Sequence, residues 1–285
     1  MPIRRTSNRS SYDSGFYNPE VYSDVGSRRI FEFDSNALTY ISAVEAADGQ
    51  ALEFNVKVAY NNFVLGCKSD GIWNSIKASC IMAGARTLSG ALVPLVGPSP
   101  SGFNFASGDY NRITGLAGDG STKYLLTNSN PNAAPETNTR FTYAVYISTL
   151  PTVSDAAAFG YRGNLSNELL QLHIISSGTI ASFYAKTTAV IPTGVSAVGF
   201  LGGSRVGNSI VFRQKNINIS GSTALTQNFS NQTNVGVFAF REVNGDRVNY
   251  SNGRMSFYLQ GDFMNLNLLD ARVSGLMVAI SGAIA

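Results

Sequence analysis

The chain has one histidine and two cysteines, and their spacing does not make a metal site. His173 lies in an alternating run, Leu170 to Ile175, with no acidic residue beside it. Cys67 and Cys80 do not form a CxxC pair, so a Cys/His ligand set lacks members. We expect no metal and no cofactor, and we interpret His173 as a packed or solvent-facing side chain. The two cysteines are expected to be reduced and buried, with a Cys67–Cys80 disulfide as the alternative.

Three patterns with catalytic potential are incomplete. No nucleophile signature stands near His173, as a Ser-His-Asp set would require. Residues 115–122 are rich in glycine but lack the Gly-Lys-Ser/Thr of a phosphate-binding loop and lead into an expected strand. Glu168 and Glu242 stand alone, whereas glycoside hydrolysis uses two carboxylates. The sequence therefore predicts a protein that is not an enzyme.

Loop side chains leave glycan binding open. A glycan site on a rigid β-sandwich needs exposed aromatic rings and hydrogen-bonding groups near them. The candidates in expected loops are Tyr161, Arg162, Asn164, Tyr250 and Asn252. The alternative is that these loop residues pack against neighbouring subunits.

Composition and charge argue against nucleic-acid binding and against a membrane protein. Charged residues are 14% of the 285 residues, against roughly 25% in ordinary soluble domains. A formal charge of +3 is too weak to argue for nucleic acid as a partner. The N-terminus has no apolar signal region, and no window of about 18 apolar residues exists, so we expect neither a leader nor a membrane span.

Three regions must position these residues. Residues 1–36 read as an extended arm that orders on a partner surface, with a disordered terminus as the alternative. Its docking residues are expected to be Phe16, Tyr17, Tyr22, Ile30, Phe31 and Phe33.

Residues 37–93 predict a small helical segment. Ser35 or Asn36 is expected to cap a first helix, which ends at Asp48-Gly49. A second helix has apolar residues from Leu52 to Phe63 at helical spacing. A third, short helix is expected from the spacing of Ile72, Trp73, Ile76 and Cys80.

Residues 94–285 predict an antiparallel β-sandwich of the jelly-roll type, closed by a C-terminal helix from Asn265 to about Ile284. Leu266, Leu269, Val273 and Met277 are expected to form an apolar stripe on this helix. The candidate strands are residues 140–148, 169–175, 179–186, 195–201, 209–214, 235–242 and 254–259.

Several stretches resemble structural proteins of tailed bacteriophages that carry a concanavalin A-like lectin/glucanase (laminin G-like) sandwich. The stretches are residues 43–53, 66–73, 76–80, 83–88, 103–105, 110–112, 118–124, 252–258 and 268–273. Within that superfamily, glucanases carry acidic residues at alternating positions of one strand, and this chain has no such strand.

The resemblance implies a virion protein, most simply a tail-fibre or head-surface fibre subunit anchored by its arm. The alternatives are a host-glycan-binding adhesin and a capsid decoration or cement protein. The implied partners are other virion proteins of the capsid or tail, further copies of the chain in a homo-oligomer such as a trimer, and a host surface glycan.

Overall fold

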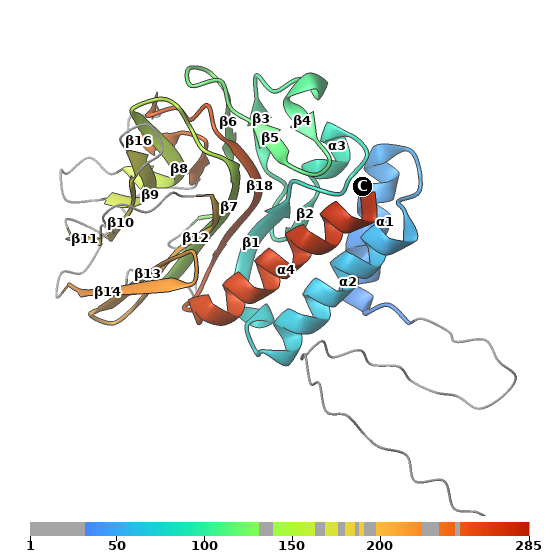
Figure 1. Cartoon of the computed structure of the whole chain (residues 1–285), viewed down its shortest axis with the longest axis horizontal. Helices are drawn as coiled ribbons and strands as arrows, with labels where there is room; N and C mark the ends of the chain where they lie inside the picture. The colour runs from blue at the N-terminus through green and yellow to red at the C-terminus, as the bar shows by residue number, and fades with distance from the viewer. Residues whose placement is uncertain are drawn as a thin grey trace, which may run out of the picture. The chain divides into compact units, whose positions relative to one another are not determined.

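The computed structural model describes residues 32–130, 139–162, 169–175, 180–185, 188–190, 198–223, 234–242 and 246–284. The chain divides into two compact units, Met1–Phe33 and Asp34–Ala285. The second unit is mainly β, with helices before the strands and one after them (Figure 1). Its two sheets form a sandwich, so the predicted fold class is confirmed.

The first sheet is built around β7, the longest described strand. Its order is β14 (Ile217–Ser222), β13 (Ser209–Gln214), β12 (Gly199–Val206), β7 (Arg140–Thr149), β18 (Arg254–Gly261), β1 (Ile76–Ile81) and β2 (Pro94–Val96). Two short strands, β5 (Gly115–Ala117) and β4 (Tyr110–Asn111), extend it beside β18. All of these pairs are antiparallel.

The second sheet faces the first across the core. Its order is β11 (Thr188–Val190), β10 (Ile180–Ala185), β9 (Leu169–Ile175), β8 (Asp155–Arg162), β15 (Gly236–Val237), β6 (Tyr124–Leu126) and β3 (Ser101–Phe103). The strand β16 (Phe240–Glu242) pairs with β8 in parallel, and β17 (Arg247–Val248) pairs with β16. Here β3 is an edge strand.

Aromatic side chains fill the space between the sheets. Phe159 of β8 lies with its ring centroid 5.0 Å from that of Tyr143 and 5.8 Å from that of Tyr258. Gly203 of β12 faces Phe183 of β10, and a Cβ at this position would overlap the phenylalanine ring. This glycine therefore allows the close approach of the two sheets.

Helices cover the other face of the first sheet. The helix α1 (Ser35–Asp48) begins at Asp34, whose carboxylate accepts a hydrogen bond from the Asn36 N–H at 2.9 Å. Asp34 is thus the N-cap residue, one position before Ser35, whereas Ser35 or Asn36 was expected from the sequence. The helix ends at Gly49, which has a left-handed φ of 68°.

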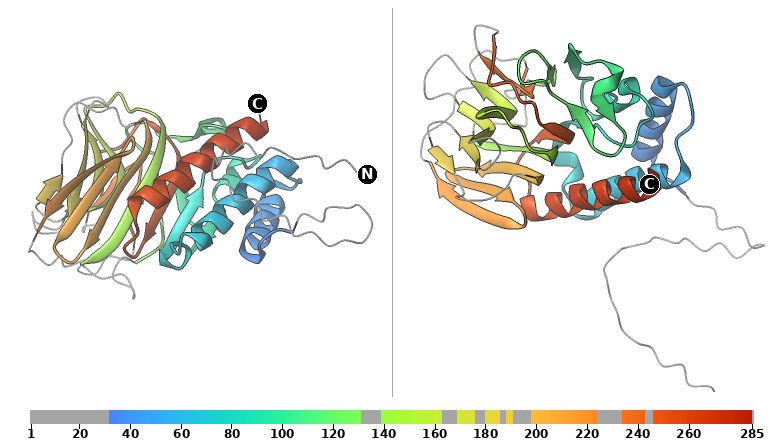
Figure 2. Two further views of the ribbon diagram at one scale, coloured as in Figure 1. Left: turned by 60° about the horizontal axis from the view of Figure 1, so that its bottom comes forward. Right: turned by 45° about the horizontal axis from the view of Figure 1, so that its top comes forward.

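The helices α2 (Phe54–Ser69) and α4 (Leu266–Ile284) lie side by side (Figures 1 and 2). The Arg272 guanidinium of α4 binds the Asp70 carboxylate, with Nε 2.7 Å and Nη2 2.8 Å from its oxygens. Gly66 makes room for this arginine, because a Cβ on Gly66 would lie 2.7 Å from the Arg272 Cδ. The stripe predicted for the closing helix is confirmed: its four residues, Leu266, Leu269, Val273 and Met277, are buried.

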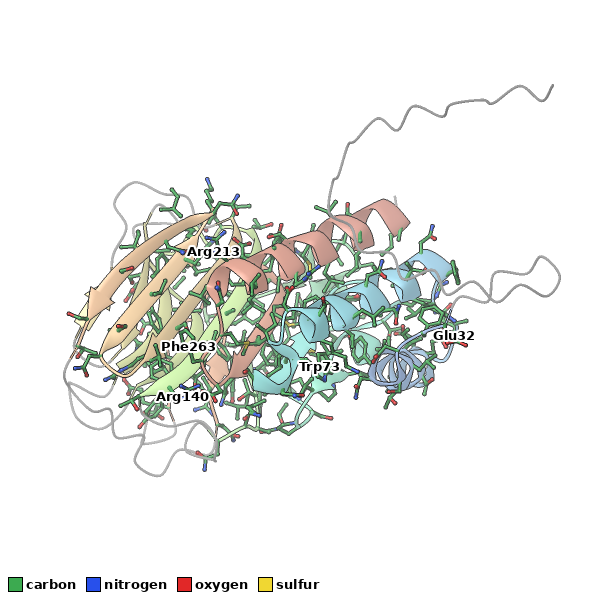
Figure 3. All side chains as sticks on the ribbon, turned by 90° about the horizontal axis from the view of Figure 1, so that it is seen from below. Glu32, Trp73, Arg140, Arg213 and Phe263 are labelled. Atoms are coloured by element: carbon green, nitrogen blue, oxygen red, sulfur yellow. The ribbon has the colours of Figure 1, made fainter. Side chains whose placement is uncertain are left out.

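A buried ion pair joins α4 to the sandwich. Arg213 of β13 donates from Nε to the Asp270 carboxylate of α4 at 2.8 Å, and both side chains are less than 10% exposed. The same guanidinium donates to the amide oxygens of Asn267 and Asn218. Figure 3 labels Arg213 near the first turns of α4.

The prediction of a third helix near Trp73 is wrong. Residues Trp73–Ser75 form one 3-10 turn, and Ile76–Ile81 form β1 between β18 and β2. Backbone hydrogen bonding to two neighbouring strands outweighs the helical spacing of this short run. The boundary expected at residue 94 accordingly falls between two paired strands, β1 and β2. Trp73 itself is half-buried, with the Lys68 ammonium 5.7 Å from its ring centroid.

Within the described part of the chain, one helix, α4, is long and apolar enough to cross a membrane by length and composition alone. From the sequence, no segment was expected to be long and apolar enough for a membrane span, and α4 departs from this expectation. In this fold its two charged residues, Asp270 and Arg272, are paired with residues of β13 and of the turn after α2. Helices in the cores of soluble proteins meet the same criterion, so this observation is weak evidence for a membrane span.

Candidate functional site

Two aromatic rings stack at the edge of the second sheet. Phe103 of β3 and Tyr124 of β6 are cross-strand partners, and their ring centroids lie 4.5 Å apart with planes 10° from parallel. Phe103 is 36% exposed although it is apolar. Phe105, beyond the end of β3, packs edge-on against Phe238 in the core at 5.5 Å. The backbone between the two rings turns at Asn104, which has a left-handed φ of 62°, so Phe103 faces solvent while Phe105 packs toward the core.

A cation and a further ring complete this group. The Arg247 guanidinium lies 4.7 Å from the Tyr124 ring centroid, and the Tyr250 ring meets Tyr124 edge-on at 6.2 Å. Cation–π contacts of this kind contribute about 0.5–1 kcal/mol at exposed sites. Burial raises the pKa of Tyr250, so its hydroxyl is protonated at neutral pH and can donate a hydrogen bond. Phe103, Tyr124, Arg247 and Tyr250 are called the aromatic stack below.

The loop before Tyr124 is fixed by its own hydrogen bonds. The Asp119 carboxylate accepts from the N–H groups of residues 121–123 and from the Thr122 hydroxyl. Burial opposes ionisation of Asp119, but these hydrogen bonds, that of the Thr122 hydroxyl first, hold its pKa well below its ordinary value. Asp119 is thus a structural anion that organises the loop.

This loop is also bonded to the segment that carries Tyr250. Gly118 and Gly120 donate from their N–H groups to the carbonyls of Gly253 and Ser251, at 3.0 and 3.2 Å. A Cβ on Gly118 would overlap the Ser251 carbonyl, so glycine is required there. Backbone hydrogen bonds therefore join the loop before Tyr124 to the segment that carries Tyr250.

The predicted glycan residues fall into different environments. Tyr250 belongs to the aromatic stack. Asn252 lies near it but is engaged internally, because its side-chain oxygen accepts from the Thr152 N–H at 2.8 Å and its amide donates to the Thr152 hydroxyl at 2.6 Å. Asn252 therefore shapes the loop.

The expectation that Tyr161 lies in a loop is wrong. Tyr161 is a residue of β8 and is fully buried in the core between the sheets. The backbone of Arg162 ends β8, and its side chain lies outside the described residues, as does the whole of Asn164. Because its side chain is buried in the core, Tyr161 cannot reach a ligand in this fold.

The predicted docking residues lie almost entirely outside the described part of the chain. Phe16, Tyr17, Tyr22, Ile30 and Phe31 belong to that outside group. Phe33 is described and is half-buried. The docking role of all six stays a prediction.

The fold brings an acid to the single histidine, contrary to the sequence expectation. The Asp155 carboxylate of β8 contacts the His173 Nε2 of β9 through Oδ1. Burial lowers the pKa of His173, while the charge of Asp155 opposes the shift, so the imidazole is neutral at pH 7. Ser182 of β10 stands opposite His173, but its hydroxyl is buried and Nε2 faces the carboxylate. This arrangement does not present a nucleophile to a substrate.

Catalytic and metal-binding groups are sparse in the part of the chain that the structure describes. No group of three or more His, Cys, Asp or Glu side chains that could hold a metal ion is present among these residues. Cys67 and Cys80 are both free and buried, and burial raises the pKa of the Cys67 thiol to about 12. The reduced state expected for both cysteines is confirmed.

The aromatic stack was missed by sequence reasoning apart from Tyr250. Tyr124 follows the glycine-rich loop of residues 118–122, and an aromatic residue near such a loop is the signal that could have drawn attention to this site. Arg247 carried no comparable signal, because its partner ring is 123 positions away in the chain and only the fold brings them together.

Comparisons with known proteins give structural likeness only. No protein-family model matches the chain, and no curated protein matches it. A carbohydrate-binding module, CBM40, of a Ruminococcus gnavus sialidase has a TM-score of 0.43 at 11% identity, over 55% of this chain and 96% of the module. Botulinum neurotoxin type C, which interacts with two ganglioside molecules, has a TM-score of 0.48 at 10% identity, over 71% of this chain and 51% of the toxin chain.

A leech intramolecular trans-sialidase has a TM-score of 0.39 at 9% identity, over 49% of this chain. The match spans about a quarter (24%) of the trans-sialidase chain. At these identities and TM-scores, none of the likenesses bears on what the present chain binds.

Proposed function

We propose that this chain is a non-catalytic, glycan-binding structural protein and that the aromatic stack holds the sugar. The observation that carries the proposal is an apolar ring, Phe103, left 36% exposed on an edge strand and backed by the Tyr124 ring. The C–H groups on one face of a pyranose form an apolar surface that packs on such a ring, while its hydroxyl groups bond to polar side chains nearby. Tyr250 and Arg247 supply donors beside the Tyr124 ring on which Phe103 stacks.

Two of the acids near the stack are engaged in other contacts, which favours binding without hydrolysis. Asp109 is paired with the Lys123 ammonium at 2.7 Å, and Asp119 is saturated by its own loop. A glycosidase needs one carboxyl group as an acid and a second as a base or nucleophile. Neither of these carboxylates is available for that role.

A glycan array tests the proposal. The purified chain is applied to host-envelope glycans, to uncharged oligosaccharides and to sialyllactose, and its best ligand is then titrated by calorimetry. Phe103→Ala is expected to weaken binding at least about tenfold, or about 1.4 kcal/mol, because it removes the stacking surface.

Ile217→Ala is the matched control, because Ile217 is an apolar side chain 53% exposed on β14, an edge strand of the other sheet. It is expected to bind as the wild type does. Binding that is equal in both variants would place the glycan away from the aromatic stack.

We further propose that the setting is a phage particle, as a tail-fibre or head-surface fibre subunit, with capsid decoration as the alternative. The support is the sequence resemblance over residues 37–285. The arm would then attach the protein to other virion proteins, and a homo-oligomer such as a trimer stays a prediction.

Deleting residues 1–33 tests this setting. The truncation keeps Asp34, which caps α1 and pairs with Lys68, so the second unit is expected to stay folded. The truncated protein is expected to be lost from purified particles, as measured by quantitative mass spectrometry of virions from a complemented infection. Occupancy equal to that of the full chain would show that the arm is not the anchor.

A further inference from the structure

The segment that carries half of the aromatic stack is tied to β8 at two points. Between Arg247 and Tyr250, the Asn249 carbonyl accepts a hydrogen bond from the Ala157 N–H at 2.7 Å. The Asn249 side-chain amide donates to Oδ2 of the Asp155 carboxylate. Asn249 has a left-handed φ of 57°, a conformation that asparagine tolerates better than most residues. Its side chain and its backbone therefore both serve the attachment.

Asp155 receives two donors at once. One carboxylate oxygen accepts from Asn249, and the other contacts the His173 imidazole. The imidazole is itself held edge-on by Phe240 of β16, with ring centroids 5.1 Å apart. The carboxylate is 51% exposed, yet it is oriented from both sides.

We propose that Asp155 is the positioning residue of the aromatic stack: with His173 behind it, it holds Asn249 and thereby sets the place of Arg247 and Tyr250. This inference rests on the proposed function, since positioning matters for recognition only if the stack binds a ligand. Asp155 does not contact the stack directly. Its effect passes through a segment that also bonds to the core at Ser251, whose N–H donates to the Phe238 carbonyl at 2.7 Å.

The same carboxylate couples the segment to the protonation of the histidine. Among the described residues packed around His173, Asp155 is the charged group that faces it; β10 contributes Ser182 and β16 contributes Phe240. Removing the Asn249 amide would leave the carboxylate with one donor, which strengthens its attraction for a protonated imidazole. The pKa of His173 therefore reports on whether Asn249 is attached.

Hydrogen exchange without any ligand is the first test. In Asp155→Asn and Asn249→Gly, the amides of residues 250–253 are expected to exchange at least about tenfold faster than in the wild type, because the segment opens more often. Glycine keeps the left-handed backbone of residue 249, so the second variant isolates the loss of the amide. Ser154→Ala, an exposed neighbour of Asp155, is the control and is expected to exchange as the wild type does.

The single histidine gives a second readout by NMR titration. The midpoint of His173 is expected below the ordinary value of about 6.5 in the wild type, lower still in Asp155→Asn and higher in Asn249→Gly. Unchanged exchange together with an unchanged midpoint in Asn249→Gly would overturn the inference.

Affinity for the best array ligand completes the experiment, with an expected loss of about tenfold in both variants. Faster exchange with unchanged affinity would overturn the positioning role. Absence of glycan binding by the wild type would overturn the proposed function and, with it, the role of Asp155 in recognition. The exchange data would still decide whether Asp155 holds the segment.

Discussion

A fragment of residues 94–285 is expected not to fold cooperatively, although it contains every other strand of both sheets. The missing strand, β1, lies between β18 and β2, so its removal leaves residues 257–261 of β18 without a partner strand on that side. The fragment also loses α2, against which α4 packs through the Arg272–Asp70 pair. Unpaired buried backbone groups and an uncovered apolar helix face both oppose folding.

Circular dichroism and thermal melting check this result. The fragment is expected to aggregate or to melt without a sharp transition, whereas residues 34–285, which keep β1 and α2, are expected to melt as the full chain does. A soluble 94–285 fragment with a cooperative transition near that of the full chain would show that β1 is dispensable.

Asp270→Ala is expected to reduce the free energy of unfolding by about 3–5 kcal/mol, the usual cost of breaking a buried ion pair. The change leaves the Arg213 charge buried, 7% exposed, with only the amide oxygens of asparagine residues near it. Denaturant unfolding of the wild type and the variant, followed by circular dichroism, gives the difference.

Two further variants separate the charge effect from simple truncation. Arg213→Met combined with Asp270→Leu removes both charges and is expected to recover most of the loss, because no buried charge remains unpaired. Arg140→Ala breaks an exposed pair with Asp262, where Arg140 is 47% exposed, and is expected to cost at most about 1 kcal/mol. Equal losses for Asp270→Ala and Arg140→Ala would contradict the assignment of Arg213–Asp270 as a buried junction.

The spacing of apolar residues was sufficient to predict the long closing helix, but it gave the wrong element for the short run from Ile72 to Cys80. The closing helix spans five turns, and its stripe was predicted correctly. The run from Ile72 to Cys80 fits helical spacing, yet Ile76, Ala78 and Cys80 also alternate as in a strand. The partners β18 and β2 decide between these patterns, and they lie elsewhere in the chain.

The strand β8 was missed for a different reason. Its sequence begins Asp155-Ala-Ala-Ala, and alanine favours helices and is uncommon in strands. The three alanines are fully buried, which shows why small residues are needed at that point. Because β8 was missed, Tyr161 and Arg162 were assigned to a loop.

The candidate site could be predicted only in part, because local sequence does not show which distant residues meet. The Tyr250 segment was found from its loop composition, but the contacts that make it a site are long-range. Asp155 and His173 are 18 positions apart and meet across β8 and β9, so the absence of an acid beside His173 in the sequence was uninformative.

NMR of the labelled rings decides whether the aromatic stack binds the glycan. The full chain, with ¹³C in its phenylalanine and tyrosine rings, is titrated with its best array ligand. The ring signals of Phe103, Tyr124 and Tyr250 are expected to shift together and to saturate with the affinity measured by calorimetry, while those of the buried Phe159 and Tyr258 stay in place. Saturable binding that leaves the Phe103 and Tyr124 signals unmoved would show that the glycan binds elsewhere on the protein.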